Sequence, residues 1–154
     1  MIDVKIEMCA CLNDGELYDE FKPFKAHESD AAYDIMAAVD DKVVLKPFET
    51  KVIPAGFKIE LPIGYEAQIR GRSGNALKRK IQIANAPGTI DSGYRGEVGV
   101  IIFNANPVEE LVIKRGEKIA QMVIAKLPDT QLVFVDSIDT ESERGENGFG
   151  STGK

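Results

Sequence analysis

Apolar and polar residues alternate along many short stretches of this chain, which is the pattern of half-buried β-strands. Residues 2–8 alternate strictly, with Asp3, Lys5 and Glu7 between aliphatic side chains. Turn-forming prolines and glycines separate the later stretches. We expect strands at residues 42–45, 51–53, 57–61, 65–69, 81–90, 98–103, 110–114, 118–126 and 131–136. Several short strands at this spacing predict an all-β fold, either a sandwich or a barrel.

The β pattern breaks at residues 71–79, Gly-Arg-Ser-Gly-Asn-Ala-Leu-Lys-Arg, whose second half predicts one short helix. An arginine and a serine between glycines at a helix start are suited to bind an anion, because the guanidinium and the helix N–H groups both favour negative charge. The alternative is a solvated turn in which Ser73 or Asn75 caps the helix.

Residues 85–99, Asn-Ala-Pro-Gly-Thr-Ile-Asp-Ser-Gly-Tyr-Arg-Gly-Glu-Val-Gly, predict a hairpin between two strands. Its glycines let a flat ligand approach the backbone closely. The turn carries Asp91 and Tyr94. On its own, an aspartate in a glycine-rich turn is more typical of an Asx-turn than of a catalytic site.

Polar residues inside apolar surroundings are further candidates. Asp34, between small and aromatic residues, is by itself more typical of a turn or strand end than of a functional site. Gln121 interrupts the apolar run at 119–124. A buried amide needs a partner, which is either a neighbouring chain or a ligand. His27 is the single histidine, and we expect it at the surface because no second histidine or nearby cysteine completes a metal site.

The composition changes at residue 138, so we expect a β domain at residues 1–137 and a mobile, glycine-rich tail at 138–154. Most such tails are frayed ends. This one, however, contains an aromatic residue, a guanidinium and two hydroxyl groups, which together can close over a base and its phosphates. The residues are Phe149, Arg144, Ser151 and Thr152.

Length and charge limit the possible functions. The 154 residues, 44% of them apolar, suit one globular domain. A net charge of −6 argues against sequence-independent nucleic-acid binding but not against a small phosphate ligand. Charged residues near the N-terminus exclude a secretory signal and a membrane span there. Cys9 and Cys11, two apart on a strand, are too distant for an easy disulfide, so we expect reduced thiols inside a cell.

Five segments with unusual chemistry, 31–35, 72–76, 85–97, 116–121 and 144–153, resemble in order and spacing the five motifs of the trimeric deoxyuridine triphosphatase (dUTPase) family. The similar strings are Arg-Ser-Gly at 72–74, Gly-Thr-Ile-Asp-Ser-Gly-Tyr-Arg-Gly at 88–96, Gly-Glu-Lys-Ile-Ala-Gln at 116–121 and Arg-Gly-Glu-Asn-Gly-Phe-Gly-Ser-Thr-Gly at 144–153. Two positions depart from the family pattern: Ala32 stands where glycine is common, and Asn75 stands where an apolar residue is usual.

The resemblance implies a jelly-roll-like subunit in a homotrimer whose active sites lie between subunits. The implied reaction is the hydrolysis of dUTP to dUMP and pyrophosphate with Mg²⁺, which is held through the phosphates and water with no direct protein ligand. Such a reaction keeps uracil out of DNA and supplies dUMP for thymidylate synthesis. The expected location is the cytoplasm of a cell or of a virus-infected cell, or the nucleus in a eukaryote, with no nucleic-acid or membrane partner.

The same resemblance implies roles for the residues of the turn at 85–99. Asp91 is the general base that holds the attacking water, since phosphoanhydride hydrolysis needs a base and a positioned water. Tyr94 packs against the deoxyribose and leaves no room for a 2′-hydroxyl. The Asn85 amide and the backbone of Gly88, Thr89 and Ile90 read the uracil.

Phosphate contacts are implied for the remaining motifs. Arg72, Ser73, Gly74 and Gln121 face the phosphates, and Asp34 orients Arg72 or metal-bound water. In the tail, Phe149 covers the uracil, while Arg144, Gly150, Ser151 and Thr152 lie at the γ-phosphate end. Catalytic roles therefore fall to Asp91, Asp34, Arg72 and Gln121.

Two alternatives remain open at this point. One is a dCTP deaminase, or a bifunctional deaminase and dUTPase, of the same fold. Deamination needs an extra acid/base group, and the candidate in this turn is Glu97, which stands at a different position from the one expected for that group. The other is a non-catalytic trimer that binds the nucleotide to regulate a partner. Retention of Asp91 and of the complete tail argues against it.

Overall fold

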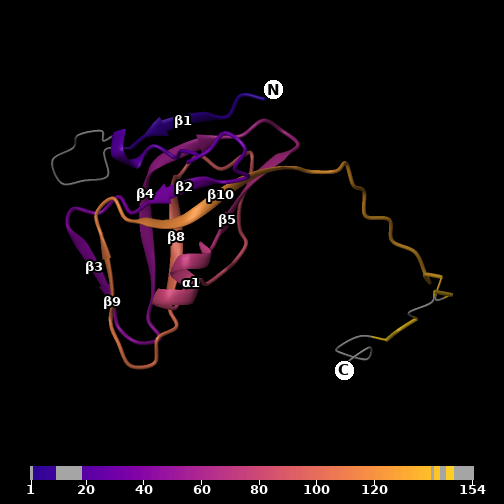
Figure 1. The fold of residues 1–154 in the computed structure, drawn as a ribbon. Helices are drawn as coiled ribbons and strands as arrows, with labels where there is room; N and C mark the ends of the chain where they lie inside the picture. Colours follow the sequence, from indigo (N-terminus) through magenta and orange to yellow (C-terminus); the bar gives the residue numbers. More distant parts are fainter. Residues whose placement is uncertain (1, 10–18, 140, 143–144, 148–154) are drawn as a thin grey trace.

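The computed structural model describes residues 2–9, 19–139, 141–142 and 145–147. Two four-stranded antiparallel sheets face each other in this part of the chain (Figure 1). The first has the order β1-β4-β8-β6 and the second β2-β10-β5-β7, while β3 and β9 form a separate pair. This arrangement confirms the all-β, jelly-roll-like prediction. The strand bounds are β1 Lys5–Met8, β2 Tyr33–Met36, β3 Lys42–Leu45, β4 Thr50–Glu60, β5 Tyr65–Arg70, β6 Ile81–Ile83, β7 Gly88–Ile90, β8 Glu97–Asn104, β9 Leu111–Lys114 and β10 Lys118–Lys126.

Helical structure is limited to two short elements in the described residues, the 3-10 helix η1 at Asp19–Phe21 and the helix α1 at Ser73–Arg79. The helix lies where the sequence predicted it. Its N-cap residue is Arg72, and no side chain caps it, which excludes the alternative in which Ser73 or Asn75 caps the helix. Lys80 ends the helix in the left-handed conformation.

The inner faces of the two sheets form the core. Alternate residues of β8, Val98, Val100 and Ile102, are almost completely buried there, as is Phe57 of β4. They pack against buried residues of the other sheet such as Ile119. The alternation that predicted the strands is therefore the alternation between core and solvent.

The prediction of separate strands at 51–53 and 57–61 was wrong, because β4 runs through Pro54 and Gly56 without interruption. The register against β8 shifts between Pro54 and Lys58, which marks a β-bulge. Gly56 has a φ of 78°, a conformation that favours glycine. The bulge therefore allows one continuous strand to contain residues that are typical of turns.

Residues 81–90 were predicted as one strand but form two, β6 and β7, in different sheets. β6 pairs with β8, where Ile83 faces Ile102, whereas β7 pairs with β5, where Ile90 faces Ala67. The stretch at 85–99 is therefore a crossing between the two sheets rather than a simple hairpin. A turn at 84–87 with a cis bond before Pro87 makes the crossing.

The strand predicted at 131–136 does not form, because no strand of the described chain pairs with it. After Leu127, whose N–H donates to Gly64 O at 2.8 Å, the chain leads away from the sheets (Figure 1). Leu132 and Phe134 are 86% and 95% exposed. This apolar segment has the composition of a strand but pairs with no strand in the described part of the chain.

No helix among the described residues is long and apolar enough to cross a membrane. Cys9 is free and half-buried, and burial raises the pKa of its thiol, which favours the unreactive protonated form. Cys11 lies outside the described residues. His27 is exposed, as predicted, and its backbone N–H donates to Asp30 Oδ2 at 2.9 Å.

Candidate active site

A cleft of about 660 Å³ opens between the start of α1 and the strands β2 and β10. It joins three of the five segments that the sequence singled out, because β10 pairs with both β2 and β5 and α1 follows β5 directly. Its lining residues are Ala26, Asp30, Ala31, Ala32, Asp34, Gly71, Arg72, Ser73, Gly74, Ala76 and Gln121.

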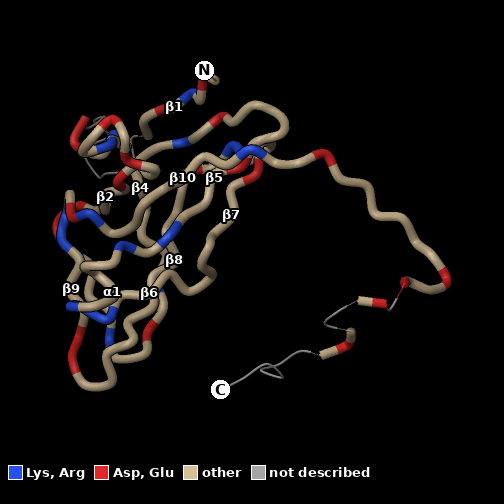
Figure 2. The backbone as a smooth tube through the Cα atoms, turned by 45° about the vertical axis from the view of Figure 1, so that its right-hand side comes forward, with Lys and Arg blue, Asp and Glu red and all other residues tan. Residues whose placement is uncertain are grey.

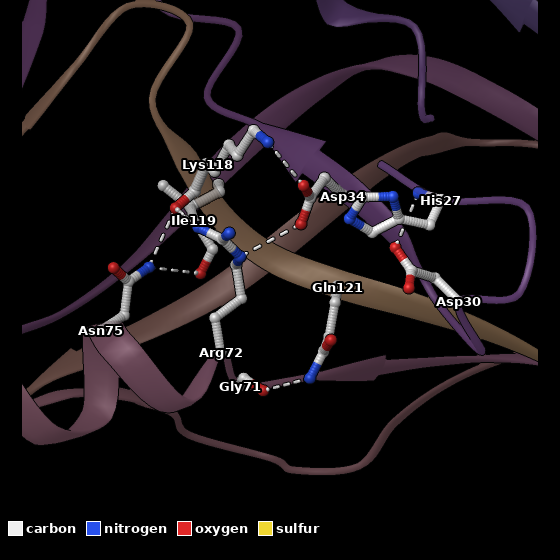
Figure 3. A network of polar contacts seen from close by, with 9 residues as sticks. All are labelled: His27, Asp30, Asp34, Gly71, Arg72, Asn75, Lys118, Ile119 and Gln121. Carbon is white, nitrogen blue, oxygen red and sulfur yellow. Dashed lines mark hydrogen bonds and ion pairs between the residues drawn. The ribbon is translucent and has the colours of Figure 1, made fainter. Parts of the chain in front are cut away.

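Asp34 is the acidic centre of a network of polar contacts beside this cleft (Figure 3). Its Oδ1 lies 3.1 Å from Arg72 Nε and its Oδ2 lies 2.7 Å from Lys118 Nζ. The Asp34 side chain is only 15% exposed, so water screens these pairs less than at an open surface. The structure thus brings Asp34 and Arg72 together.

The Gln121 side chain is bonded within its own chain, whereas the sequence suggested a partner in a neighbouring chain or a ligand. Its Nε2 donates to Gly71 O at 2.8 Å, so neither a neighbouring chain nor a ligand is required to satisfy that group. The bond ties β10 to the backbone immediately before Arg72. The side chain still lines the cleft, which leaves its carbonyl oxygen as a further polar group there.

Arg72 is the basic residue in the lining of this cleft, and further basic residues lie along α1. The chain from Arg72 to Lys80 contains Lys78 and Arg79 as well, and Figure 2 shows Lys and Arg positions gathered around α1 and β9. Beyond β10, by contrast, the described chain carries Asp and Glu but no Lys or Arg. The charge distribution within a net-acidic protein therefore favours an anionic ligand near α1.

Asp91, Thr89, Ile90 and Tyr94 do not line this cleft. Ile90 pairs with Ala67 on β5, five residues before Arg72, which corresponds to about 16 Å along an extended strand. Asp91 is exposed. A single chain therefore holds the expected phosphate site and the expected general base on separate parts of its surface.

The turn at 85–94 is nevertheless shaped for close approach. A Cβ on Gly88 would lie 3.2 Å from Asn85 Nδ2 and 3.4 Å from Ile69 Cβ, so a larger residue would displace its neighbours. The Tyr94 hydroxyl donates to Glu97 O at 2.8 Å and covers Gly96, where a side chain would overlap it. This bond fixes the tyrosine ring, which remains 44% exposed.

The tail residues expected at the site, Arg144, Phe149, Gly150, Ser151 and Thr152, lie outside the described residues. Two further residues beside the network, Lys118 and Asn75, were not among the site residues expected from the sequence. Asn75 Nδ2 donates to Lys118 O at 2.9 Å, and Lys118 contacts Asp34. The sequence around Lys118 did not indicate a role for it, because its contact with Asp34 depends on the pairing of β10 with β2.

The cleft suits a hydrated cation better than a directly bound one. Both oxygens of Asp34 already contact cations, and the described residues contain no group of three or more His, Cys, Asp or Glu side chains that could hold a metal. Asp30 and Asp34 are the carboxylates that line it. They fit as hydrogen-bond acceptors for water bound to Mg²⁺, which keeps several waters in most protein sites.

The protein-family model described as dUTPase matches residues 22–153. The deoxyuridine 5′-triphosphate nucleotidohydrolase of Clostridium novyi is 52% identical over 132 residues, covering 85% of this chain and 89% of that protein. The corresponding protein of Hydrogenobaculum sp. is 46% identical over 135 residues, covering 88% and 92%.

Solved structures agree. A mutant dUTPase of Staphylococcus bacteriophage 80alpha with dUpNHpp has a TM-score of 0.83 at 28% identity and covers all of both chains. A mutant dUTPase from phage phi11 of S. aureus, described with a structural Mg(II) ion, has a TM-score of 0.75 at 25% identity, covering 92% of this chain and all of that one. The family-model match and the identity to curated relatives decide the question: this chain belongs to the dUTPase family.

Proposed function

We propose that this chain hydrolyses dUTP to dUMP and pyrophosphate by attack of a water molecule on the α-phosphorus. The observation that carries the proposal is the convergence of Asp34, Arg72 and Gln121 on one cleft in a chain of the dUTPase family. The reaction keeps uracil out of DNA and supplies dUMP for thymidylate synthesis. We place it in the cytoplasm, where the nucleotide pool is available.

The cleft beside α1 is the proposed phosphate site. Arg72 offers a guanidinium held by Asp34, and a fixed guanidinium matches phosphate oxygens well. Ser73 and Gly74 line the cleft next to it, where charge develops on the leaving pyrophosphate. Gln121 adds a polar amide group. Mg²⁺, held by the phosphates and water with Asp34 as an acceptor, neutralises further negative charge when bound.

Asp91 is the proposed general base. Its carboxylate is exposed at the end of β7 and can hold a water by hydrogen bonding. The separation from Arg72 within one chain requires that the base act in the cleft of a neighbouring subunit. This requirement supports a homotrimer with shared active sites, and so does the exposed apolar segment with Leu132 and Phe134, since few monomers leave such a patch uncovered.

Substrate selection is assigned to the crossing between the sheets. The Asn85 amide and the backbone groups of Gly88, Thr89 and Ile90 suit the hydrogen-bonding edge of uracil. Cytosine would place an amino group against a donor, and thymine would push its methyl group into the turn. The Tyr94 ring, fixed by its bond to Glu97 O, rejects a 2′-hydroxyl by steric exclusion.

The tail at residues 138–154 is the proposed lid. Phe149 would cover the uracil, while Arg144, Gly150, Ser151 and Thr152 would contact the γ-phosphate, so that closure excludes water except at the attack position. Ordering the tail costs about 1–2 kcal/mol per backbone residue, which favours closure only over a bound triphosphate.

The deaminase alternative loses support from the position of Glu97. Its Oε1 accepts a hydrogen bond from the Gly56 N–H at 3.1 Å, at the bulge of β4. That contact engages one oxygen of the carboxylate at the neighbouring strand β4. A purely nucleotide-sensing trimer would not need the exposed Asp91.

An assay of four nucleotides tests the proposal. Purified protein with Mg²⁺ should release pyrophosphate from dUTP far faster than from dCTP, dTTP or UTP. Ammonia release from dCTP is measured in parallel, because its appearance would favour the deaminase. Equal rates on all four nucleotides would contradict the assigned specificity.

A further inference from the structure

Strand β10 carries a β-bulge at its start, next to the cleft. Against β2, Lys118 pairs with Met36 and Ala120 with Ile35, so Ile119 is an extra residue on β10. Ile119 and Ala120 are consecutive, yet both have 0% exposure. Side chains of a regular strand point alternately to opposite faces. The bulge therefore shifts this alternation by one residue.

The shift decides where Lys118 points. Lys118 and Gln121 are three positions apart, a separation that puts side chains on opposite faces of a regular strand. With the bulge between them, both reach the cleft side of the sheet: Lys118 contacts Asp34, and Gln121 lines the cleft. Figure 3 shows Lys118 and Arg72 approaching Asp34 from two directions.

Asn75 holds the bulge from the helix. Its Nδ2 donates to Lys118 O at 2.9 Å and lies 3.5 Å from Ile119 O, the carbonyls of the bulged residues. Arg72 Nη1 lies 3.4 Å from the same Lys118 O. The helix that presents Arg72 is thus tied to the bulge that presents Lys118. This contact accounts for the polar residue at position 75.

The second cation changes the charge that the cleft offers. Asp34 alone would neutralise Arg72, and Asp30 is a second carboxylate in the cleft; Lys118 adds the positive charge that balances it. The Phe24 ring lies 4.6 Å from Lys118 Nζ and holds the ammonium from its other side. Without Lys118 the two carboxylates would outnumber Arg72, which would disfavour binding of a triphosphate.

We propose that Lys118 and Asn75 are positioning residues for dUTP hydrolysis. Asn75 fixes the bulge, the bulge places Lys118 on Asp34, and Lys118 leaves Arg72 with charge available for the triphosphate. The inference rests on the proposed function of the cleft, and it assigns no direct contact with the reacting atoms to either residue.

Lys118→Met tests the charge. We expect KM for dUTP and the Kd of the uncleavable analogue dUpNHpp to rise about tenfold, whereas kcat changes much less. A tenfold change corresponds to the loss of one charge-assisted contact, here that of Lys118 with Asp34. The rise should shrink at high salt, because salt screens the remaining charges. Lys118→Arg should restore KM. Lys126→Met, on the exposed end of the same strand, is the matched control and should leave both constants unchanged.

Asn75→Leu tests the bulge, since it keeps a similar volume and no charge but removes the donor. It should raise KM for dUTP, as Lys118→Met does. The KM of the double variant should be no higher than that of Lys118→Met alone, because both substitutions act through one contact. Additive losses would overturn the link between the two residues. Thermal unfolding of each variant shows whether it folds; if Asn75→Leu does not, the Lys118 series carries the test.

Inorganic tripolyphosphate separates this inference from the proposed function, because its binding needs no uracil. Weaker tripolyphosphate binding by Lys118→Met than by the wild-type chain in calorimetry supports the charge role even if dUTP is not hydrolysed. Equal binding of tripolyphosphate, or failure of Lys118→Arg to restore KM, overturns it.

Discussion

The carboxylate of Asp34 and the guanidinium of Arg72 form an ion pair of 3.1 Å that joins β2 to the start of α1. The two residues come from separate sequence motifs and meet because β10 lies between β2 and β5. Arg72 is held by a partner with 15% exposure, which limits the orientations of its guanidinium. The pair is the fixed element of the proposed phosphate site.

Asp34→Asn should lower kcat/KM for dUTP about tenfold, because loss of one charge-assisted contact of about 1.4 kcal/mol leaves Arg72 free to change orientation. Steady-state pyrophosphate release measures the effect. Asp41→Asn, an exposed aspartate, is the control and should behave as wild type. An Asp34→Asn enzyme with normal kcat/KM would remove the orienting role.

Asp91→Asn should lower kcat by about 100- to 10,000-fold, the range for loss of a general base, while the affinity for dUpNHpp stays within a few fold. Single-turnover kinetics and calorimetry measure the two quantities separately. Asp129→Asn, exposed beyond β10, is the control for charge loss. Retention of full turnover would show that another group activates the water.

Deletion of residues 144–154 should leave a folded oligomer whose kcat/KM is at least about tenfold lower, since the γ-phosphate loses at least one charge-assisted contact. Analytical ultracentrifugation and the dUTP assay measure assembly and activity. Deletion of Lys154 alone, which lies beyond the matched family region, should have no effect. An unchanged rate after the longer deletion would exclude the tail from the reaction.

Asn104→Ala should lower the free energy of unfolding by about 3 kcal/mol, because it leaves several buried carbonyl groups without a donor. Asn104 is 0% exposed and its Nδ2 donates to Leu45 O at 3.1 Å and to Glu109 O at 3.0 Å. Urea unfolding at fixed protein concentration measures the change. Gln82→Ala, on the exposed face of β6, should change it by less than about 0.5 kcal/mol.

Glu49 should make a pH-dependent contribution to stability. The Lys46 N–H donates to Glu49 Oε2 at 2.7 Å, and this bond holds the pKa of the carboxyl below its ordinary value of 4.5. A group whose pKa is lowered by folding stabilises the protein above its unfolded-state value and loses that contribution as the pH falls through the folded-state value. The melting temperature of Glu49→Gln should therefore lie below that of wild type at neutral pH and approach it well below pH 4.5. A constant difference across this window would contradict the assignment.

Most strands were predictable because alternation between apolar and polar residues is a local property. The stretches at 42–45 and 118–126 coincide with β3 and β10, and 98–103 lies inside β8. The errors occur where pairing is not local. The bulge at Gly56 allows one strand to pass through turn-forming residues, and residues 81–90 divide because their two halves pair with different strands.

Three residues that line the cleft were singled out from the sequence, but which candidate residues meet there was not predictable. The motif strings singled out Asp34, Arg72 and Gln121, and the structure brings these three to one cleft. It does not bring Asp91 there. Short strings cannot show which parts of a site meet within one chain, since that depends on strand order.

The sequence by itself determined the fold class, the family and the candidate chemistry, because hydrophobic alternation and closely spaced functional residues are encoded locally. Only the tertiary structure decided that Gln121 bonds Gly71 O, that the expected base lies apart from the cleft, and that Lys118 faces Asp34. The physical reason is register: one extra residue, Ile119, in the pairing of β10 with β2 changes the face of the sheet on which Lys118 lies. That pairing exists only once distant strands have packed together.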